Sequence, residues 1–243
     1  MKTTLEVCID SANGLQTCIE NGVDRIELCM ALELGGLTPS AGIMHLAAQS
    51  SATVTAMIRP RAGNFCFNDQ EINIMCSDIA MAKTAGMAGV VIGVATPQNE
   101  LNYPAMVQLC KAADGMQITL HRVIDTLDNP LYAIEQAIDL GIHTILSSGG
   151  QPSVKDGVTQ LGEMQLIAAG KVSIMAGCGL TPELIPVIYR ETGISAFHSS
   201  CKSSSPTHRN TEKFGFASSM MDSTDAEVIQ SYQKVLHDLE LEK

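Results

Sequence analysis

Residues 171–200 read KVSIMAGCGLTPELIPVIYRETGISAFHSS, and this stretch decides the fold. Two apolar runs rich in β-formers, 171–179 and 194–200, flank a segment with helical punctuation. That segment opens with Thr181 as a candidate N-cap before Pro182 and closes at Gly193. A strand, a helix and a second strand in succession predict parallel βα units.

The same pattern recurs along the chain. Eight apolar runs with helical segments between them occupy residues 4–10, 24–30, 53–60, 88–94, 116–123, 143–150, 171–179 and 194–200. In 243 residues this repetition predicts one TIM-type (β/α)8 barrel domain, with a long loop over 201–223 and a terminal helix over 224–241. The alternative is an open doubly wound sheet, but the first turn, VCIDSANG, lacks the glycine-rich sequence that such sheets favour.

Charge and composition narrow the function classes. Acids outnumber bases 26 to 15, for a net charge of −11, which argues against binding a nucleic-acid backbone. No uninterrupted apolar run reaches the roughly 18 residues of a membrane span, and the first residues lack a signal-peptide pattern. The eight cysteines include no CxxC pair, which favours free thiols in a reducing compartment. We expect a cytoplasmic protein with no membrane or nucleic-acid partner.

Charged residues gather where the barrel would open. Alternation along the strands places Glu27, Arg59 and His121 on inward positions, and the C-terminal strand ends of a TIM barrel carry its site. Unpaired charges inside a barrel are costly, so pairing is expected. The predicted pairs are Glu27 with Arg59, and Arg61 or Arg122 with Asp10 or Asp125. The alternatives are a purely structural ion network, or charges that point outward to the helices.

Glycine-rich turns after the last three barrel strands suggest an anion site. Backbone amides in such turns often bind phosphate, and arginines can hold a second anionic group in bidentate fashion. The candidate anion-binding residues are Arg59, Arg61, Arg122, Ser148, Gly149, Gly177, Gly179 and Ser199. Alternatively, the glycines only permit tight turns.

An anion site at the barrel mouth would suit an enzyme of lyase, isomerase or hydrolase type acting on a small anionic metabolite, phosphorylated or not. Its candidate catalytic residues are Glu27 or Asp125 as base, His121 as acid, and Arg59 with Arg61 as the anion clamp.

Cysteines point to a different chemistry. Closing the barrel brings Cys178, Cys201, Cys8 and Cys29 from four consecutive strands or their loops toward one another. Thiolates select soft ions such as Cu(I), for which two ligands can suffice. Alternatively, each cysteine is a small core hydrophobe, and His198, the best inward imidazole of the last strand, is a satisfied core histidine.

Five motifs together resemble the CutC family of copper homeostasis proteins: GVDRIELCMALELGGLTPSAG, MIRPRAGNFCF, HRVID, ILSSGG and FHSS. The resemblance implies a TIM-barrel-like fold, a cytoplasmic location, homo-oligomerisation and a role in copper handling. It places Cys29 at the cysteine suspected of Cu(I) contact. The chain differs from the family pattern at Ala62, Asn64 and Cys178, where glycine, aspartate and glycine are usual. It also has Val123 and Ile124 where alanine and phenylalanine are expected. Asn64 cannot act as a base.

Overall fold

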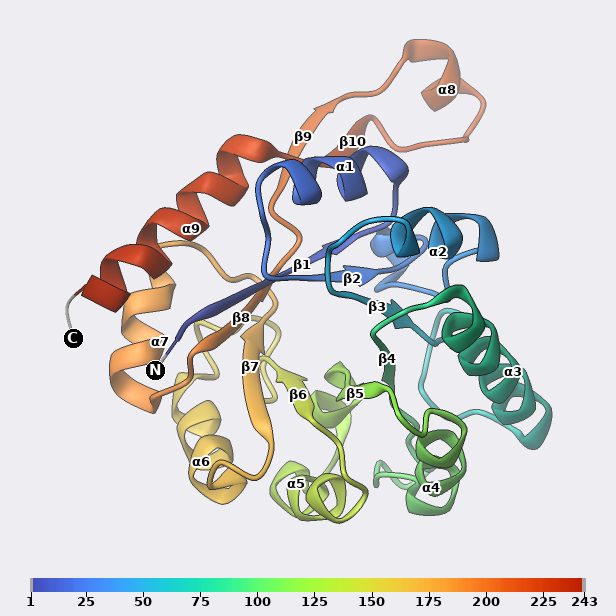
Figure 1. Ribbon diagram of the computed structural model, residues 1–243, viewed down its shortest axis with the longest axis vertical. Coiled ribbons are helices and arrows are strands. Elements are labelled where there is room, and N and C mark those ends of the chain that lie inside the picture. The colour runs from blue at the N-terminus through green and yellow to red at the C-terminus, as the bar shows by residue number, and fades with distance from the viewer. Residues whose placement is uncertain (1, 242–243) are drawn as a thin grey trace.

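The computed structural model describes residues 2–241 and contains a closed barrel of eight parallel strands (Figure 1). Each strand pairs with the next in chain order, and β8 closes the ring against β1. The predicted barrel and all eight predicted strand positions are confirmed. The strands are β1 (Thr4–Ile9), β2 (Arg25–Leu28), β3 (Val54–Met57), β4 (Gly89–Ile92), β5 (Gln117–Leu120), β6 (Thr144–Ser147), β7 (Ser173–Gly177) and β8 (Ala196–Ser199).

Helices form a ring outside the strands (Figure 1). Several begin at polar caps: the Ser11 side chain accepts a hydrogen bond from the amide of Gly14, and Asn68 forms a capping box with Glu71. None of the helices within residues 2–241 is long and apolar enough to cross a membrane. The helices are α1 (Ala12–Glu20), α2 (Ala41–Ala48), α3 (Asp69–Ala85), α4 (Tyr103–Ala112), α5 (Pro130–Asp139), α6 (Val158–Ala168), α7 (Leu184–Thr192) and α9 (Ala226–Leu241), with 3-10 turns η1 (Leu32–Leu34) and η2 (Arg122–Thr126).

The start of α7 differs from the prediction. The amide of Leu184 bonds the carbonyl of Thr181, and the amide of Ile185 bonds that of Pro182, so this segment first makes a tight i to i+3 turn. The helix therefore begins at Leu184, and Thr181 is not its N-cap.

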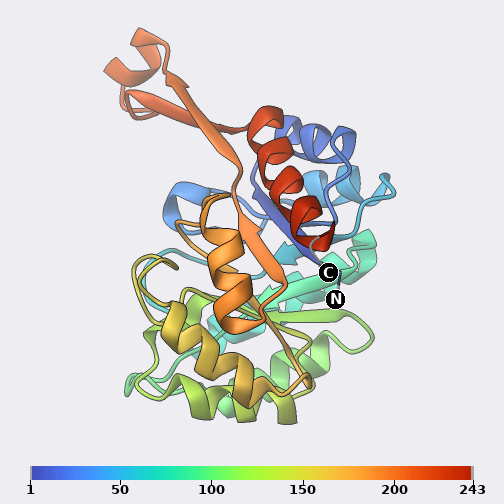
Figure 2. The same ribbon diagram turned by 90° about the vertical axis from the view of Figure 1, so that its left-hand side faces the viewer.

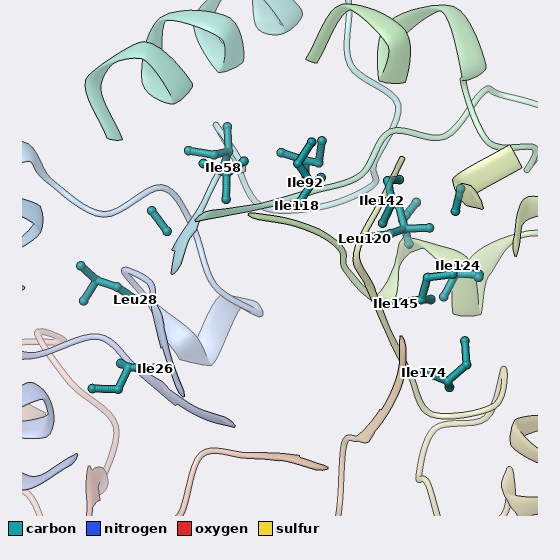
Figure 3. Packing of buried hydrophobic residues seen from close by; sticks show 14 of the residues in the cluster. Ile26, Leu28, Ile58, Ile92, Ile118, Leu120, Ile124, Ile142, Ile145 and Ile174 are labelled. Atoms are coloured by element: carbon teal, nitrogen blue, oxygen red, sulfur yellow. The ribbon is translucent and has the colours of Figure 1, made fainter. Parts of the chain in front are cut away.

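The main apolar core lies between the strands and the helices, not inside the barrel. Alternate strand residues such as Ile26 and Leu28 point outward into this layer, part of which Figure 3 shows. Within residues 2–241, the residues of opposite parity contribute two small apolar clusters to the interior: Cys29 with Met57 and Val91, and Leu146 with Met175 and Ala196. The remaining interior is left to polar side chains, which is where the site lies.

Residues 201–223 are not the predicted loop. An arm formed by β9 (Lys202–Pro206), α8 (Arg209–Lys213) and β10 (Met220–Thr224) leaves the barrel after β8 and projects away from it (Figure 2). β9 and β10 pair antiparallel, with Lys202 opposite Thr224. The terminal helix begins at Ala226, two residues later than predicted.

Candidate functional site

Three side chains from different strands line a cavity of about 170 Å³ at the carboxyl end of the barrel. Glu27 lies on β2, Arg59 follows β3 and His121 follows β5. Leu34, Gly35, Met57, Phe65, Arg122 and Leu146 complete the wall. The structure thus brings together three of the residues that the sequence predicts for the site.

Arg59 is held by loop carbonyls. Its Nη1 donates to the carbonyls of Leu34 at 2.8 Å and Gly36 at 3.1 Å, and its Nη2 donates to that of Gly63 at 2.8 Å. The guanidinium also stacks on Phe65, 4.9 Å from the ring centre. Burial, with the nearby charge of Arg61, lowers the pKa of Arg59. Among residues 2–241 the predicted ion pair with Glu27 is absent, because these carbonyls occupy both terminal nitrogens.

His121 presents a neutral ring to the cavity. Its Nδ1 accepts a hydrogen bond from the amide of Val123 at 3.1 Å, a pattern that assigns the ring proton to Nε2. Burial, followed by the charge of Arg59, lowers the pKa of His121 to about 3. Gly93 makes this placement possible, since a Cβ there would lie 2.5 Å from Cε1 of the ring.

Beneath the cavity, a buried charge network connects β1, β2 and β8. Glu6 accepts a hydrogen bond from Nε of Arg25 and pairs with Nδ1 of His198 at 2.8 Å. Burial raises the pKa of Glu6, but the hydrogen bond and charge of His198, together with Arg25, outweigh this and leave it lowered. Nε2 of His198 lies 3.8 Å from Glu27. Sequence reasoning missed Arg25, although it shares the inward parity of Glu27 and alternation alone would have found it.

Glu27 joins this network to the cavity. Burial raises the pKa of Glu27, the charge of His198 opposes the rise and Glu6 adds to it. One carboxyl oxygen, Oε2, faces His198 and accepts a weak hydrogen bond from Sγ of Cys29 at 3.5 Å. The other, Oε1, is buried without a partner. Glu27, which lines the cavity, therefore has one carboxyl oxygen without a hydrogen-bond partner.

Two of the four predicted cysteines lie beside Glu27. Ligand atoms of Cys8, Glu27 and His198 all lie within 4.8 Å of one another, a spacing that could hold a metal ion. Burial raises the pKa of Cys29 well above its usual value, and Glu27 and Cys8 contribute to this rise. Cys8 and Cys29 therefore both lie beside the carboxylate of Glu27.

The other two cysteines line a second cavity. This cavity, of about 300 Å³, lies at the ends of β7 and β8 and includes Cys178, Gly179, His198, Ser199, Cys201 and Lys202 in its wall. Sγ of Cys178 lies 3.2 Å from the carbonyl oxygen of Pro152. Burial raises the pKa of Cys201 to about 11. His198 borders this cavity and approaches Glu27 of the first, so it lies between the two.

Arg61 does not share the position of Arg59. Its guanidinium pairs with Glu71 of α3, donates to the carbonyl of Cys66 at 2.8 Å and lies over Phe67. Neither predicted partner of Arg61 is its actual one. Asp10 instead accepts a hydrogen bond from the amide of Leu32 at 3.0 Å.

Asp125 fills the turn after β6. It pairs with Arg122 at 2.8 Å, as predicted, and accepts hydrogen bonds from the amides of Ser148 and Gly150 and from the hydroxyls of Ser147 and Ser148. An external phosphate at these amides would have to displace this carboxylate.

Two of the predicted anion-binding glycines are required for close packing. A Cβ at Gly149 would lie 2.2 Å from the carbonyl oxygen of Gly157. A Cβ at Gly177 would lie 2.8 Å from Leu146.

The family model described as the CutC family matches residues 3–203. The chain belongs to the CutC family. A CutC family protein of Rhizobium meliloti (strain 1021) is 40% identical over 231 residues, which cover 95% of this chain and 94% of the relative. The CutC family protein of Photobacterium profundum is 44% identical over 209 residues, covering 86% and 85%.

Solved structures agree with the family and with the fold. The crystal structure of CutC from Streptococcus agalactiae matches with a TM-score of 0.77 at 31% identity, covering 82% of this chain and 98% of that one. Thiamine phosphate pyrophosphorylase from Pyrococcus furiosus matches with a TM-score of 0.60 at 13% identity, covering 97% and 96%. At that identity the second match shows the TIM-barrel fold alone.

Proposed function

We propose that this CutC-family protein acts in copper homeostasis by binding Cu(I) through Cys29 and Cys8. The related Streptococcus agalactiae protein is described as a candidate copper homeostasis protein. The observation that carries the proposal is the meeting of Cys8, Glu27 and His198 within 4.8 Å, with the Cys29 thiol 3.5 Å from the same glutamate. Soft thiol sulfur, supplemented by imidazole, is the donor set that Cu(I) prefers.

Geometry favours Cys8 as the partner of Cys29. Cys178 and Cys201 border the other cavity, and Sγ of Cys178 contacts the carbonyl of Pro152. The hard carboxylate of Glu27 is a poor ligand for Cu(I), so its part would be to accept a proton or hydrogen bond beside the sulfurs. Because burial keeps Cys29 protonated, binding the ion must release a proton from this site.

An anaerobic Cu(I) titration tests the proposal. The wild type should bind Cu(I) stoichiometrically in competition with a chromogenic chelator, and Cys29→Ser and Cys8→Ser should each lose that binding. Cys110→Ser is the matched control, since Cys110 is a partly buried free cysteine on α4. Equal binding by the wild type and both site variants would refute the proposal.

The proposal extends to the cellular compartment, the partners and the oligomeric state of the protein. Eight free cysteines in the described chain support a reducing cytoplasm, and the net charge of −11 supports the absence of nucleic-acid partners. We also propose a homo-oligomer without a membrane partner. Light scattering should therefore give a mass that is a multiple of the chain's 25.8 kDa, and a mass of one chain would contradict the oligomer.

A second candidate function is an enzyme acting on a small anionic metabolite. It is favoured by the unpartnered Oε1 of Glu27 and Nε2 of His121 in one cavity. Glu27 would act as base, while His121, whose pKa is about 3, would donate a hydrogen bond from its neutral ring. Incubation with a metabolite mixture, followed by NMR, should show one component consumed by the wild type and not by Glu27→Gln. No consumption would remove this candidate.

A further inference from the structure

Three buried polar atoms without a partner belong to residues that line one cavity. They are Nε of Arg59, Nε2 of His121 and Oε1 of Glu27, on side chains of residues that are only 5%, 4% and 3% exposed. Buried polar groups are almost always paired in native proteins, and an unpaired one costs about 1–3 kcal/mol. Three such atoms, brought to one space by three different strands, indicate that a bound molecule completes them.

We propose that the Glu27–Arg59–His121 cavity binds a small monocarboxylate, whose oxygens accept hydrogen bonds from Nε of Arg59 and Nε2 of His121. This site adjoins the proposed thiol pair for Cu(I), and Glu27 borders both. It also gives the second candidate function a ligand class, but it requires binding only and not turnover.

The charge of Arg59 requires an anion. Its recorded partners are neutral carbonyl groups and the ring of Phe65, and no ion pair to Arg59 is found in residues 2–241. Arginine does not lose its proton in proteins, and a buried cation without a counter-ion is strongly unfavourable. A bound carboxylate would supply that counter-ion, with the planar geometry that guanidinium matches well.

His121 adds a donor to the cavity without adding a charge. Nδ1 of its ring accepts the amide of Val123, so the remaining N–H, at Nε2, is a second donor beside Arg59. One cation beside a neutral imidazole matches a singly charged ligand better than a phosphate dianion.

The apolar lining and the volume of the cavity limit the size and polarity of the ligand's carbon portion. Leu34, Met57, Phe65 and Leu146 surround the polar groups, so the carbon portion should be short and apolar. A water molecule occupies about 30 Å³ of liquid, so about 170 Å³ leaves room for a few non-hydrogen atoms. Arg61 takes no part, since it pairs with Glu71 outside the cavity.

Calorimetric titration of metal-free protein tests the inference. The probes are butyrate, 2-oxobutyrate, the neutral isostere butyramide and inorganic phosphate. We expect at least one carboxylate to bind, and butyramide and phosphate to bind at least about tenfold more weakly, as the loss of one charge-assisted hydrogen bond implies. Binding of butyramide or phosphate as tight as that of the carboxylates would overturn the inference. So would the absence of carboxylate binding up to about 10 mM.

Variants localise the binding. Arg59→Lys and His121→Asn should each weaken it at least about tenfold, while the matched control Arg61→Lys should leave it unchanged. His121→Asn retains an acceptor for the amide of Val123, so circular dichroism should show a folded barrel even if Arg59→Lys disturbs the loops. Cys8→Ser and Cys29→Ser should still bind the carboxylate. If the protein binds Cu(I) but no carboxylate, this inference is refuted and the proposed copper function is not. Equal weakening by Arg61→Lys would also refute this inference.

Discussion

At the scale of single residues, Cys178 is under backbone strain that glycine would relieve. Its φ is 77°, in the left-handed region, and its thiol lies 3.2 Å from the carbonyl oxygen of Pro152. A residue with a Cβ pays about 1–2 kcal/mol in this region. We expect Cys178→Gly to raise the free energy of unfolding by about 1 kcal/mol in urea titrations. Cys178→Ala, which keeps the Cβ, should show no such gain, and a less stable glycine variant would contradict the argument.

His121 should make stability depend on pH. Its pKa is about 3 in the folded protein against 6.5 for an ordinary histidine, because of burial and then the charge of Arg59. Between these values the unfolded chain binds a proton that the folded ring does not, so stability falls as pH falls. From pH 6.5 to 5 the wild type should lose about 1.6 kcal/mol more than His121→Asn. Urea midpoints at several pH values measure this, and parallel profiles would contradict it.

At the scale of elements, Asp125 joins η2 to the turn after β6. The amides of Ser148 and Gly150 both donate to its carboxylate, at about 3.0 Å. We expect Asp125→Ala to reduce the free energy of unfolding by about 2–4 kcal/mol, because these donors and Arg122 lose their acceptor. The vacated turn would then offer amides and a guanidinium to an anion.

Sulfate should therefore partly rescue Asp125→Ala. Thermal unfolding with sodium sulfate, compared with sodium chloride at equal ionic strength, should raise the Tm of this variant more than that of the wild type. Asp128→Ala, which changes an exposed carboxylate nearby, is the control and should respond like the wild type. Equal sulfate responses in all three proteins would show that the turn does not bind anions.

The sequence predicts which site residues point into the barrel, but it does not predict which groups they contact. Alternation along a strand suffices to place Glu27, Arg59 and His121 inside the barrel, because side chains change face at every residue. Their partners depend on loops that fold back over the mouth, and nothing local in the sequence predicts that Arg59 meets carbonyls while Arg61 meets Glu71. The turn after β6 binds an anionic group of the chain itself, because the carboxylate of Asp125 accepts the hydrogen bonds of its amides.

At the scale of the whole molecule, the barrel and the arm differ in how sequence encodes them. Buried faces leave a periodic apolar pattern in the barrel strands. None of residues 202–228 is buried, so β9 and β10 show no such pattern. Large apolar side chains are instead exposed on the arm, at Phe214, Phe216, Met220 and Met221. The sequence therefore predicts only a loop in this segment.

Removing the arm should leave the barrel and its sites intact. Lys202 and Thr224 lie opposite each other at its base, and the amide of Asp225 bonds the carbonyl of Cys201 at 2.8 Å, so a short Gly-Ser-Gly link can replace residues 203–223. Because this change exposes no core, we expect Tm to shift by less than about 5 °C, with Cu(I) and carboxylate binding unchanged. Circular dichroism melts and the two titrations measure this. Loss of cooperative unfolding would mean that the arm stabilises the ring it leaves, through β10 where Thr224 approaches Gly14 of α1.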